Sequence, residues 1–301
     1  MNEWKAMGLK KRPASLSFLQ ISLDSGRPHG RIAYAIFEKG TSEPILYAKI
    51  YRRPADNRLQ TREFELMKKL GRQKGIRESV PAPLMLKEIN GHAVFFESAV
   101  PGYPMSSLIR SANRERQEIF RSFTEQAVLC VADWAGSFYR QAGNGKTVLD
   151  EQFFEKEVAA RIREFSGNLS LGDEERKRYL SFFRKRFEEA KGMRLPLLAT
   201  HGNLGPQNIL LDLEQERLFV IDWKMAKEGE ALPLRDFHSF LLYYLYRTYE
   251  CGLVQSAELD DAFRESFIQR SDWFGELVSK GIARFYSSWG VDERLERLLF
   301  P

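Results

Sequence analysis

The spacing of apolar residues changes near residue 100, and this change restricts the fold more than any other feature of the chain. Before it, three β-rich runs are separated by turn residues: SLSFLQISL (15–23), RIAYAIFEKG (31–40) and PILYAKIYRR (44–53). Two further runs, PLMLKEI (83–89) and HAVFFES (92–98), are joined by Asn90-Gly91, a strong hairpin signal. We therefore expect about five antiparallel strands in the first hundred residues.

Helical spacing appears once in this first part and takes over after it. In RLQTREFELMKKLGRQ (58–73), apolar residues recur at near-helical intervals, at Leu59, Phe64, Met67 and Leu70. Beyond residue 100, amphipathic runs cover 114–141, 150–165, 173–190, 234–250 and 261–289. The pattern predicts an α+β chain with two lobes. Residues 1–99 would form a small antiparallel sheet with one helix, and residues 100–301 a larger, mainly helical lobe.

Length and composition are those of an ordinary globular protein. The chain has 301 residues, of which 43% are hydrophobic and 29% charged, which argues against a disordered or fibrous class. No signal-peptide h-region opens it, and no run of about 18 apolar residues indicates a spanning helix. The two cysteines lie in helix-like apolar runs, so no disulfide framework is expected. A cytoplasmic protein without a transmembrane segment is therefore expected.

The chain is basic, with a formal net charge of +5 and a pI near 9.1. This charge favours anionic ligands or an anionic surface, and it leaves peripheral contact with a membrane open. In RKRYLSFFRKRF (176–187) the basic residues alternate with aromatic ones on an expected helix, which is typical of a solvated helix face. Nucleic-acid binding is not expected, because no stacking platform or DNA-reading motif accompanies the charge.

The stretch HGNLGPQNILLDLEQERLFVIDW (201–223) places polar residues among apolar ones. Its apolar runs predict a hairpin centred near Gln215, in which Asn208 and Asp222 lie opposite one another and point into the same cleft. An amide oxygen and a carboxylate at a strand end are hard oxygen ligands of the type that Mg²⁺ takes beside substrate phosphates. A pair of structural polar residues that cap a hairpin is the alternative.

Lys49 lies in the apolar strand ILYAKIY, where an unpaired ammonium group would be costly. Glu63 follows fourteen residues later, in the first turn of the single expected helix, so the two side chains could pair. A lysine held by a glutamate beside a metal-binding carboxylate suits a nucleoside triphosphate, because phosphoryl transfer depends mainly on positioning and charge neutralisation. A lysine that snorkels from an edge strand is the alternative.

Together these features resemble the aminoglycoside phosphotransferase and choline kinase family, the small-molecule branch of the protein-kinase-like fold. The resemblance covers nearly the whole chain. It rests on Lys49 and Glu63, the linker ESAVPGYPM, the loop HGNLGPQNIL, which is similar to H-G-D-x-x-x-x-N, and VIDW followed by LRDFHSFL. It implies an ATP-dependent phosphotransferase that moves the γ-phosphoryl group of Mg-ATP to a hydroxyl of a sugar-like or amino-alcohol acceptor.

The resemblance also implies a role for each matching residue. Lys49 would contact the α- and β-phosphates, and Glu63 would orient Lys49. The other cofactor contacts would come from the turn at Ser25 and Gly26 over the phosphates, the backbone around Glu97 to Ala99 against adenine, and Asn208 and Asp222 on Mg²⁺. His201 and Asp236 would support the loop and take no part in the chemistry.

The chain departs from the family pattern at the catalytic position, because Asn203 stands where the catalytic aspartate is expected, and the turn DSGRPHG is poorer in glycine than the protein-kinase loop, which matters little. Asparagine can orient a substrate hydroxyl but cannot accept its proton, and general-base catalysis is worth ~10² to 10⁴ in rate. Three explanations stay open. The chain is an active kinase that loses the proton to solvent, to a phosphate oxygen or to another carboxylate; a nucleotide-binding pseudokinase that acts as a binding or scaffold protein; or a variant with an introduced Asp→Asn substitution. The other expected nucleotide and metal residues are retained, which favours a phosphotransferase with intact nucleotide binding.

The sequence leaves several classes of acceptor open. In this fold the C-lobe helices build the acceptor site, here within 114–141 and 260–289. Their aromatic and basic residues would suit a sugar, a choline-like amine or an aminoglycoside equally. The positive charge favours an anionic acceptor, such as a phosphorylated or acidic sugar.

Overall fold

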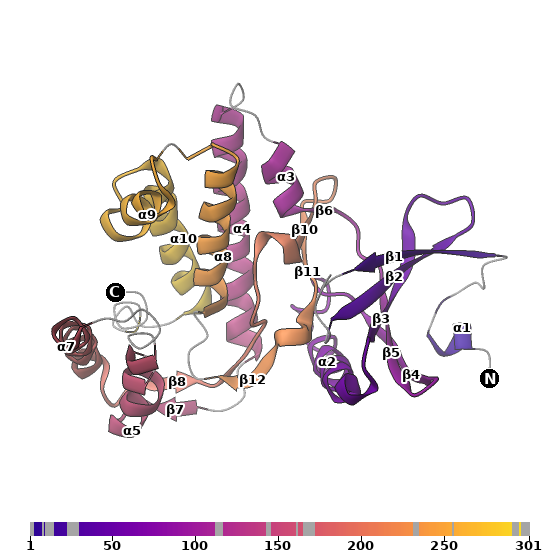
Figure 1. Cartoon of the computed structure of the whole chain (residues 1–301), viewed down its shortest axis with the longest axis horizontal. Helices are drawn as coiled ribbons and strands as arrows, with labels where there is room; N and C mark the ends of the chain where they lie inside the picture. Colours follow the sequence, from indigo (N-terminus) through magenta and orange to yellow (C-terminus); the bar gives the residue numbers. More distant parts are fainter. Residues whose placement is uncertain are drawn as a thin grey trace. The chain divides into compact units, whose positions relative to one another are not determined.

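The chain divides into two compact units (Figure 1). The computed structural model describes residues 3–7, 9, 15–22, 30–111, 117–142, 146–160, 162–164, 172–230, 235–254, 256–290 and 295. Unit 1 contains residues 1–108 and 206–225, and unit 2 contains residues 109–205 and 226–301. This division differs from the one expected at residue 99, because the hairpin segment 206–225 groups with the sheet and not with the helices.

Unit 1 is built on a five-stranded antiparallel sheet in the order β1-β2-β3-β5-β4. The strands are β1 (Leu16–Ser22), β2 (Arg31–Glu38), β3 (Pro44–Tyr51), β4 (Pro83–Ile89) and β5 (His92–Ser98). A short helix, α1 (Glu3–Ala6), lies near the start of the chain. Asn90 and Gly91 both have positive φ in the turn between β4 and β5, as the hairpin signal predicts. The predicted α+β class and five-stranded sheet are confirmed.

The predicted helix of the first hundred residues is α2 (Asn57–Leu70), which follows a 3₁₀ turn at Pro54–Asp56 and is longer than the four-residue α1. Its buried apolar side chains are Leu66, Met67 and Leu70. Phe64 meets Phe95 of β5 edge to face, with ring centroids 5.5 Å apart, and this contact holds the helix against the sheet. The acidic Glu63 is also buried, so its carboxylate requires a partner inside the unit.

The predicted hairpin forms, but its register is shifted by one residue. β10 (Ile209–Asp212) pairs with β11 (Arg217–Val220), and β6 (Tyr103–Pro104) adds a third strand beside β10. Ile209 lies opposite Val220, and the Ile221 amide donates to the Asn208 carbonyl at 2.9 Å. The prediction that Asn208 lies opposite Asp222 is therefore wrong.

The turn of the hairpin gives the physical reason for this shift. Four residues, 213–216, connect the two strands. The Oδ1 atom of Asp212 accepts hydrogen bonds from the amides of Glu214 and Gln215, at 3.1 and 3.2 Å, and Glu216 has a φ of 52°. A side chain that bonds to its own turn is a local choice of turn geometry that apolar spacing does not reveal.

Unit 2 is mainly helical, as predicted. Its long helices are α4 (Gln117–Ala142), α7 (Asp173–Ala190), α8 (Arg235–Glu250) and α10 (Trp273–Trp289), and α3 (Met105–Ser111) crosses the division between the units. Shorter helical segments are α5 (Glu151–Phe153), α9 (Leu259–Phe263) and the π-helical turns Phe154–Ala159 and Arg264–Gln269. None of the helices in the described part of the chain is long and apolar enough to cross a membrane.

Four short strands of unit 2 were not predicted. β7 (Lys146–Val148) pairs with β8 (Arg194–Pro196), and β9 (Leu198–Thr200) pairs with β12 (Lys227–Glu230), both antiparallel. Strands of three or four residues are too short to show an alternation of apolar and polar side chains. The run 261–289 is also interrupted, because Arg270 takes a φ of 53° and α10 begins only after Asp272.

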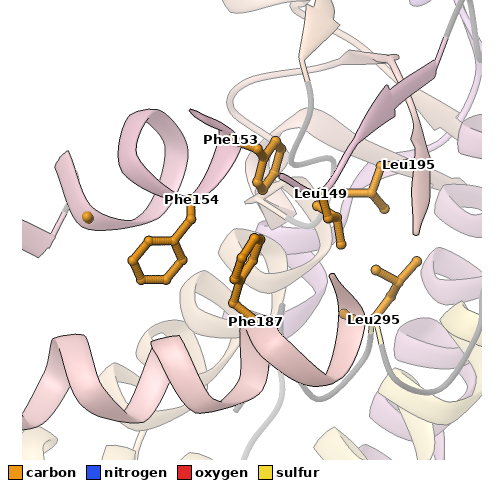
Figure 2. Packing of buried hydrophobic residues seen from close by; sticks show 8 residues of the cluster. Leu149, Phe153, Phe154, Phe187, Leu195 and Leu295 are labelled. Carbon is orange, nitrogen blue, oxygen red and sulfur yellow. The ribbon is translucent and has the colours of Figure 1, made fainter. Parts of the chain in front are cut away.

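One hydrophobic cluster of unit 2 joins α5, α7 and β8 (Figure 2). Its labelled members are Leu149, Phe153, Phe154, Phe187, Leu195 and Leu295. Arg184 covers one edge of it, with its guanidinium 3.7 Å from the centre of the Phe154 ring. Only Phe187 and Ala190 of α7 are buried, which confirms the solvated face predicted for this helix.

In unit 2, α4 and α10 pack closely at Gly136. A Cβ atom at this position would lie 2.6 Å from the Cβ of Ser288 and 2.7 Å from the carbonyl oxygen of Phe285. We expect Gly136→Ala to lower the free energy of unfolding by about 1–3 kcal/mol, because the added methyl group overpacks a closed interface. Urea denaturation measures this loss. Ser122→Ala, on an exposed position of the same helix, is the control and should not destabilise the protein. Equal stability of the two variants would contradict the packing.

Candidate active site

Six charged side chains of unit 1 form an alternating series of ion pairs, called here the ion chain. In order of contact they are Lys224, Asp222, Arg31, Glu63, Lys49 and Glu97. Three are cations and three are carboxylates, so the ion chain has no formal net charge. Its members at one end, Asp222 and Lys224, have side chains that are 16% exposed, whereas the other four residues are buried.

The register of the sheet brings part of the ion chain together. Ala33 lies opposite Lys49, and Tyr47 lies opposite Glu97. Residues that are directly opposite, or two apart on one strand, share a face of the sheet. Arg31, Lys49 and Glu97 therefore project from the same face, and α2, which contacts β3 and β5, brings Glu63 to them.

Lys49 has two carboxylate partners. Its Nζ atom lies 3.9 Å from Oε1 of Glu63, which agrees with the predicted pairing of strand and helix. It forms a closer ion pair with Glu97, whose side chain the sequence reasoning had overlooked because it considered only the backbone there. Burial raises the pKa of Glu97, although the neighbouring Lys49 opposes this rise. The cross-strand position of Glu97 on the face of Lys49 is the signal that could have revealed it.

Arg31 is one of two members of the ion chain that the sequence analysis missed, the other being Lys224. Its guanidinium has no exposed surface and donates to Oε2 of Glu63 through Nη1 and to Oδ1 of Asp222 through Nη2. Burial alone would lower the pKa of Arg31, but the two carboxylates raise it above its ordinary value. Its place at the start of a strand with buried alternate residues, Ala33 and Ala35, was the available signal.

Asp222 lies beyond the end of β11 in an unusual backbone conformation, with a φ of 65°. Aspartate tolerates this left-handed region better than most residues do. Oδ1 accepts from Arg31, and Oδ2 lies 3.4 Å from Nζ of Lys224. Both carboxylate oxygens therefore already face a cation.

This arrangement bears on the prediction that Asn208 and Asp222 bind Mg²⁺. Asn208 is buried, and its backbone carbonyl accepts a hydrogen bond from the Ile221 amide. Its expected partner in metal binding, the carboxylate of Asp222, is neutralised by Arg31 and Lys224. Within the described ranges, no three or more His, Cys, Asp or Glu side chains gather in a group that could hold a metal ion. In this arrangement Asp222 does not fit a magnesium ion. Binding of Mg²⁺ by Asn208 and Asp222 is therefore not confirmed and stays a prediction.

The remaining nucleotide contacts also stay predictions. Ser25 and Gly26, expected over the phosphates, lie outside the described residues. The Ala99 amide, expected near adenine, donates to the Ile45 carbonyl over 3.4 Å, which is long for a hydrogen bond. Ala99 also lines a pocket of about 640 Å³ whose basic side chains are Lys68, Arg72, Arg77 and Arg217.

The loop that carries Asn203 belongs to unit 2 and is held by Asp236, in the first turn of α8. Oδ2 of Asp236 accepts from the His201 amide at 2.6 Å and from the Tyr139 hydroxyl at 2.9 Å. Oδ1 accepts from the Gly202 amide at 2.8 Å. These bonds confirm that Asp236 braces the loop, and they add Tyr139, which the sequence analysis missed.

The protonation of this brace follows from its burial. Burial raises the pKa of Asp236, and the nearby His201 opposes this rise. Burial also raises the pKa of Tyr139, as does the neighbouring Asp236, so the phenol stays protonated and donates. The Asn203 amide donates to Nδ1 of His201 at 3.3 Å, so this nitrogen is the acceptor. The backbone of the loop is therefore fixed on both sides of Gly202.

The family model described as the phosphotransferase enzyme family matches residues 29–270. The chain belongs to the phosphotransferase enzyme family. This membership confirms the resemblance that the sequence suggested. The family contains enzymes that transfer phosphoryl groups, and the matched range includes the ion chain and the braced loop.

Solved structures of aminoglycoside phosphotransferases are similar to this family member over most of its length. Aminoglycoside phosphotransferase APH(3'')-Id from Streptomyces rimosus ATCC10970 is 15% identical, with a TM-score of 0.49, and 94% of this chain and 93% of that chain are covered. Aminoglycoside-3'-phosphotransferase of type VIII is 20% identical, with a TM-score of 0.46 and coverage of 94% and 92%. No curated protein sequence matches significantly.

The ion chain makes the pairing of Lys49 with Glu97 measurable. We expect Lys49→Met to destabilise this phosphotransferase family member by about 3–5 kcal/mol, because it leaves a buried carboxylate without its cation. The double variant Lys49→Met/Glu97→Gln should recover part of this loss. Urea denaturation of both single variants and the double variant gives the coupling energy.

Lys68→Met is the matched control for this cycle. Lys68 pairs with Glu65 at 3.3 Å on the exposed side of α2, and its side chain is 40% exposed. An exposed pair is worth about 0.2–1 kcal/mol, so its loss should be small. If Lys49→Met cost no more than Lys68→Met, the buried pair would not support the fold.

Proposed function

We propose that this member of the phosphotransferase family phosphorylates a small molecule, moving the γ-phosphoryl group of ATP to a hydroxyl of a sugar-like or amino-alcohol acceptor. The observation that carries the proposal is the brace on the loop of Asn203. Three donors, the amides of His201 and Gly202 and the hydroxyl of Tyr139, converge on the carboxylate of Asp236. A fixed loop is useful for a transfer that depends on positioning.

Asn203 defines what the braced loop can do chemically. Its side-chain oxygen can accept a hydrogen bond from the acceptor hydroxyl and so align it, but it cannot take up the proton. The proton then leaves to solvent or to a phosphate oxygen, and a loose transition state tolerates such late loss. We therefore propose a slow enzyme whose catalysis rests on orientation and not on a general base.

In unit 1, the nucleotide would be held by a side chain of the sheet. Lys49 is the residue of the ion chain that would contact the phosphates, while Glu63 and Glu97 hold its ammonium group. Magnesium, when bound with the nucleotide, would neutralise phosphate charge. Because Asp222 does not fit a metal as arranged, no step of the proposed mechanism passes through a metal at that carboxylate.

Two properties of the reaction partners follow from this proposal. With ATP as the proposed donor, we also propose that the protein works in the cytoplasm. The net charge of +5 favours an acceptor that is itself anionic, such as a phosphorylated or acidic sugar.

A second candidate function is a nucleotide-binding protein without transfer activity. Asn203 removes the proton acceptor, and Arg31 neutralises the carboxylate that would hold the metal. Both features would weaken phosphoryl transfer, whereas Lys49 and its two carboxylate partners are retained. A protein of this kind would act by binding, as a scaffold or sensor.

Substitution at the loop tests the first candidate. We expect Asn203→Asp to raise phosphoryl transfer by ~10²- to 10⁴-fold, because a carboxylate restores the general base. The measurement is release of ADP across a panel of sugars, phosphorylated sugars, amines and aminoglycosides. Asn90→Asp makes the same chemical change in the exposed β4–β5 turn and should leave the rate unchanged. No activity in either the natural chain or Asn203→Asp would favour the second candidate.

Nucleotide binding separates both candidates from a protein that binds no nucleotide. At about 100 times its Kd, ATP should stabilise the folded protein by about 2.7 kcal/mol, because it binds the folded state alone. Thermal unfolding with ATP, GTP and no nucleotide, each with and without Mg²⁺, measures this effect. Absence of stabilisation by every nucleotide would contradict both candidates.

A further inference from the structure

A fully buried guanidinium contacts Oδ1 of Asp222, the carboxylate that was expected to bind a metal ion. Arg31 donates to Asp222 and to Glu63 at once, and Lys224 lies on the second oxygen of Asp222. We propose that Arg31 is the built-in counter-ion of Asp222 and takes the place of a divalent metal ion at this carboxylate. This goes beyond the proposed function and applies to either candidate, because it concerns the protein without nucleotide or acceptor.

The charge of the ion chain supports this assignment. Its three cations and three carboxylates balance without a metal ion. A divalent ion at Asp222 would leave two uncompensated positive charges beside side chains that are almost completely buried. Because burial of unpaired charge is costly, this arrangement disfavours binding of a divalent metal ion at Asp222.

The shape of the guanidinium also suits its place. Its two terminal nitrogens point to carboxylates on different elements, Glu63 on α2 and Asp222 after β11. A planar fork can bridge two carboxylates in a fixed geometry, which a lysine ammonium does less well. A metal that took Asp222 from Arg31 would leave half of this fork without a partner inside the unit, where it has no exposed surface.

The backbone holds Asp222 where Arg31 reaches it. The two residues before Asp222 are fixed by backbone hydrogen bonds. The Ile221 amide donates to the Asn208 carbonyl at 2.9 Å, and the Val220 amide donates to the Ser79 carbonyl at 2.8 Å. The indole of Trp223 donates to the Val220 carbonyl at 3.0 Å. Asp222 therefore sits between two anchored residues, and a change of its partner would require Arg31 to move.

The first test compares the natural chain with Asp222→Asn, in which an amide of similar shape replaces the carboxylate. Mn²⁺ is titrated into nucleotide-free protein while electron paramagnetic resonance reports free Mn²⁺, and the melting temperature is compared in EDTA and in millimolar Mg²⁺. We expect the same free Mn²⁺ signal for the natural chain and for Asp222→Asn, and no shift of the melting temperature. Loss of the free signal with the natural chain but not with Asp222→Asn would overturn the proposal.

The second test removes the guanidinium. Arg31→Met should lower the melting temperature by roughly 5 to 15 °C, because two buried carboxylates lose their shared cation. Mn²⁺ or Mg²⁺ should then restore part of this loss, since the carboxylate of Asp222 becomes available. The double variant Arg31→Met/Asp222→Asn should show no such restoration.

Arg52→Met is the control for this series, because Arg52 is an exposed arginine just after β3. It should unfold at the temperature of the natural chain and should not respond to metal. If Arg31→Met folds and binds no Mn²⁺, Asp222 is not a latent metal ligand and the proposal fails. Because no nucleotide or acceptor is present, a protein without transfer activity would leave these outcomes unchanged.

Discussion

The pairing of Arg31 with two carboxylates is the interaction on which the arrangement of unit 1 depends. It joins the start of β2, the helix α2 and Asp222 just after β11, which are far apart in the sequence. A buried charge is tolerated when it is paired and hydrogen-bonded, so the buried Arg31 favours the arrangement in which its two carboxylates lie beside it. Arg31 thus links the sheet, its helix and the hairpin, in addition to contacts such as that of Phe64 with Phe95.

The parts of the fold that apolar spacing controls could be predicted from the sequence, and the parts that charge pairing controls could not. The alternation in β2 and β3 and the Asn90-Gly91 turn gave the sheet, because these signals are local. The partners of Lys49 depend on the register with β5, which no local pattern contains. The hairpin register was missed by one residue because Asp212 selects the turn.

The braced loop and the ion chain illustrate two ways of holding a polar group. Asp236 is satisfied by amides and a phenol, which carry no charge and fix the loop by direction alone. In the ion chain each side chain is instead paired with at least one side chain of opposite charge. The bonds of Asp236 go to the amides of His201 and Gly202 and to the Tyr139 hydroxyl, so these three bonds do not depend on the type of side chain at position 203.

Because the ion pairs of the ion chain share their side chains, movement of Asp222 would change the ion pairs of Lys49. Asp222 lies near the partly exposed end and Glu97 at the buried end, one residue before the end of β5. If an ion or ligand drew Asp222 away from Arg31, the guanidinium would pull more strongly on Glu63. The 3.9 Å contact between Glu63 and Lys49 is the longest in the chain and would weaken first. Lys49 would then depend on Glu97 alone, so occupancy of Asp222 would act on the strand that leads into the linker.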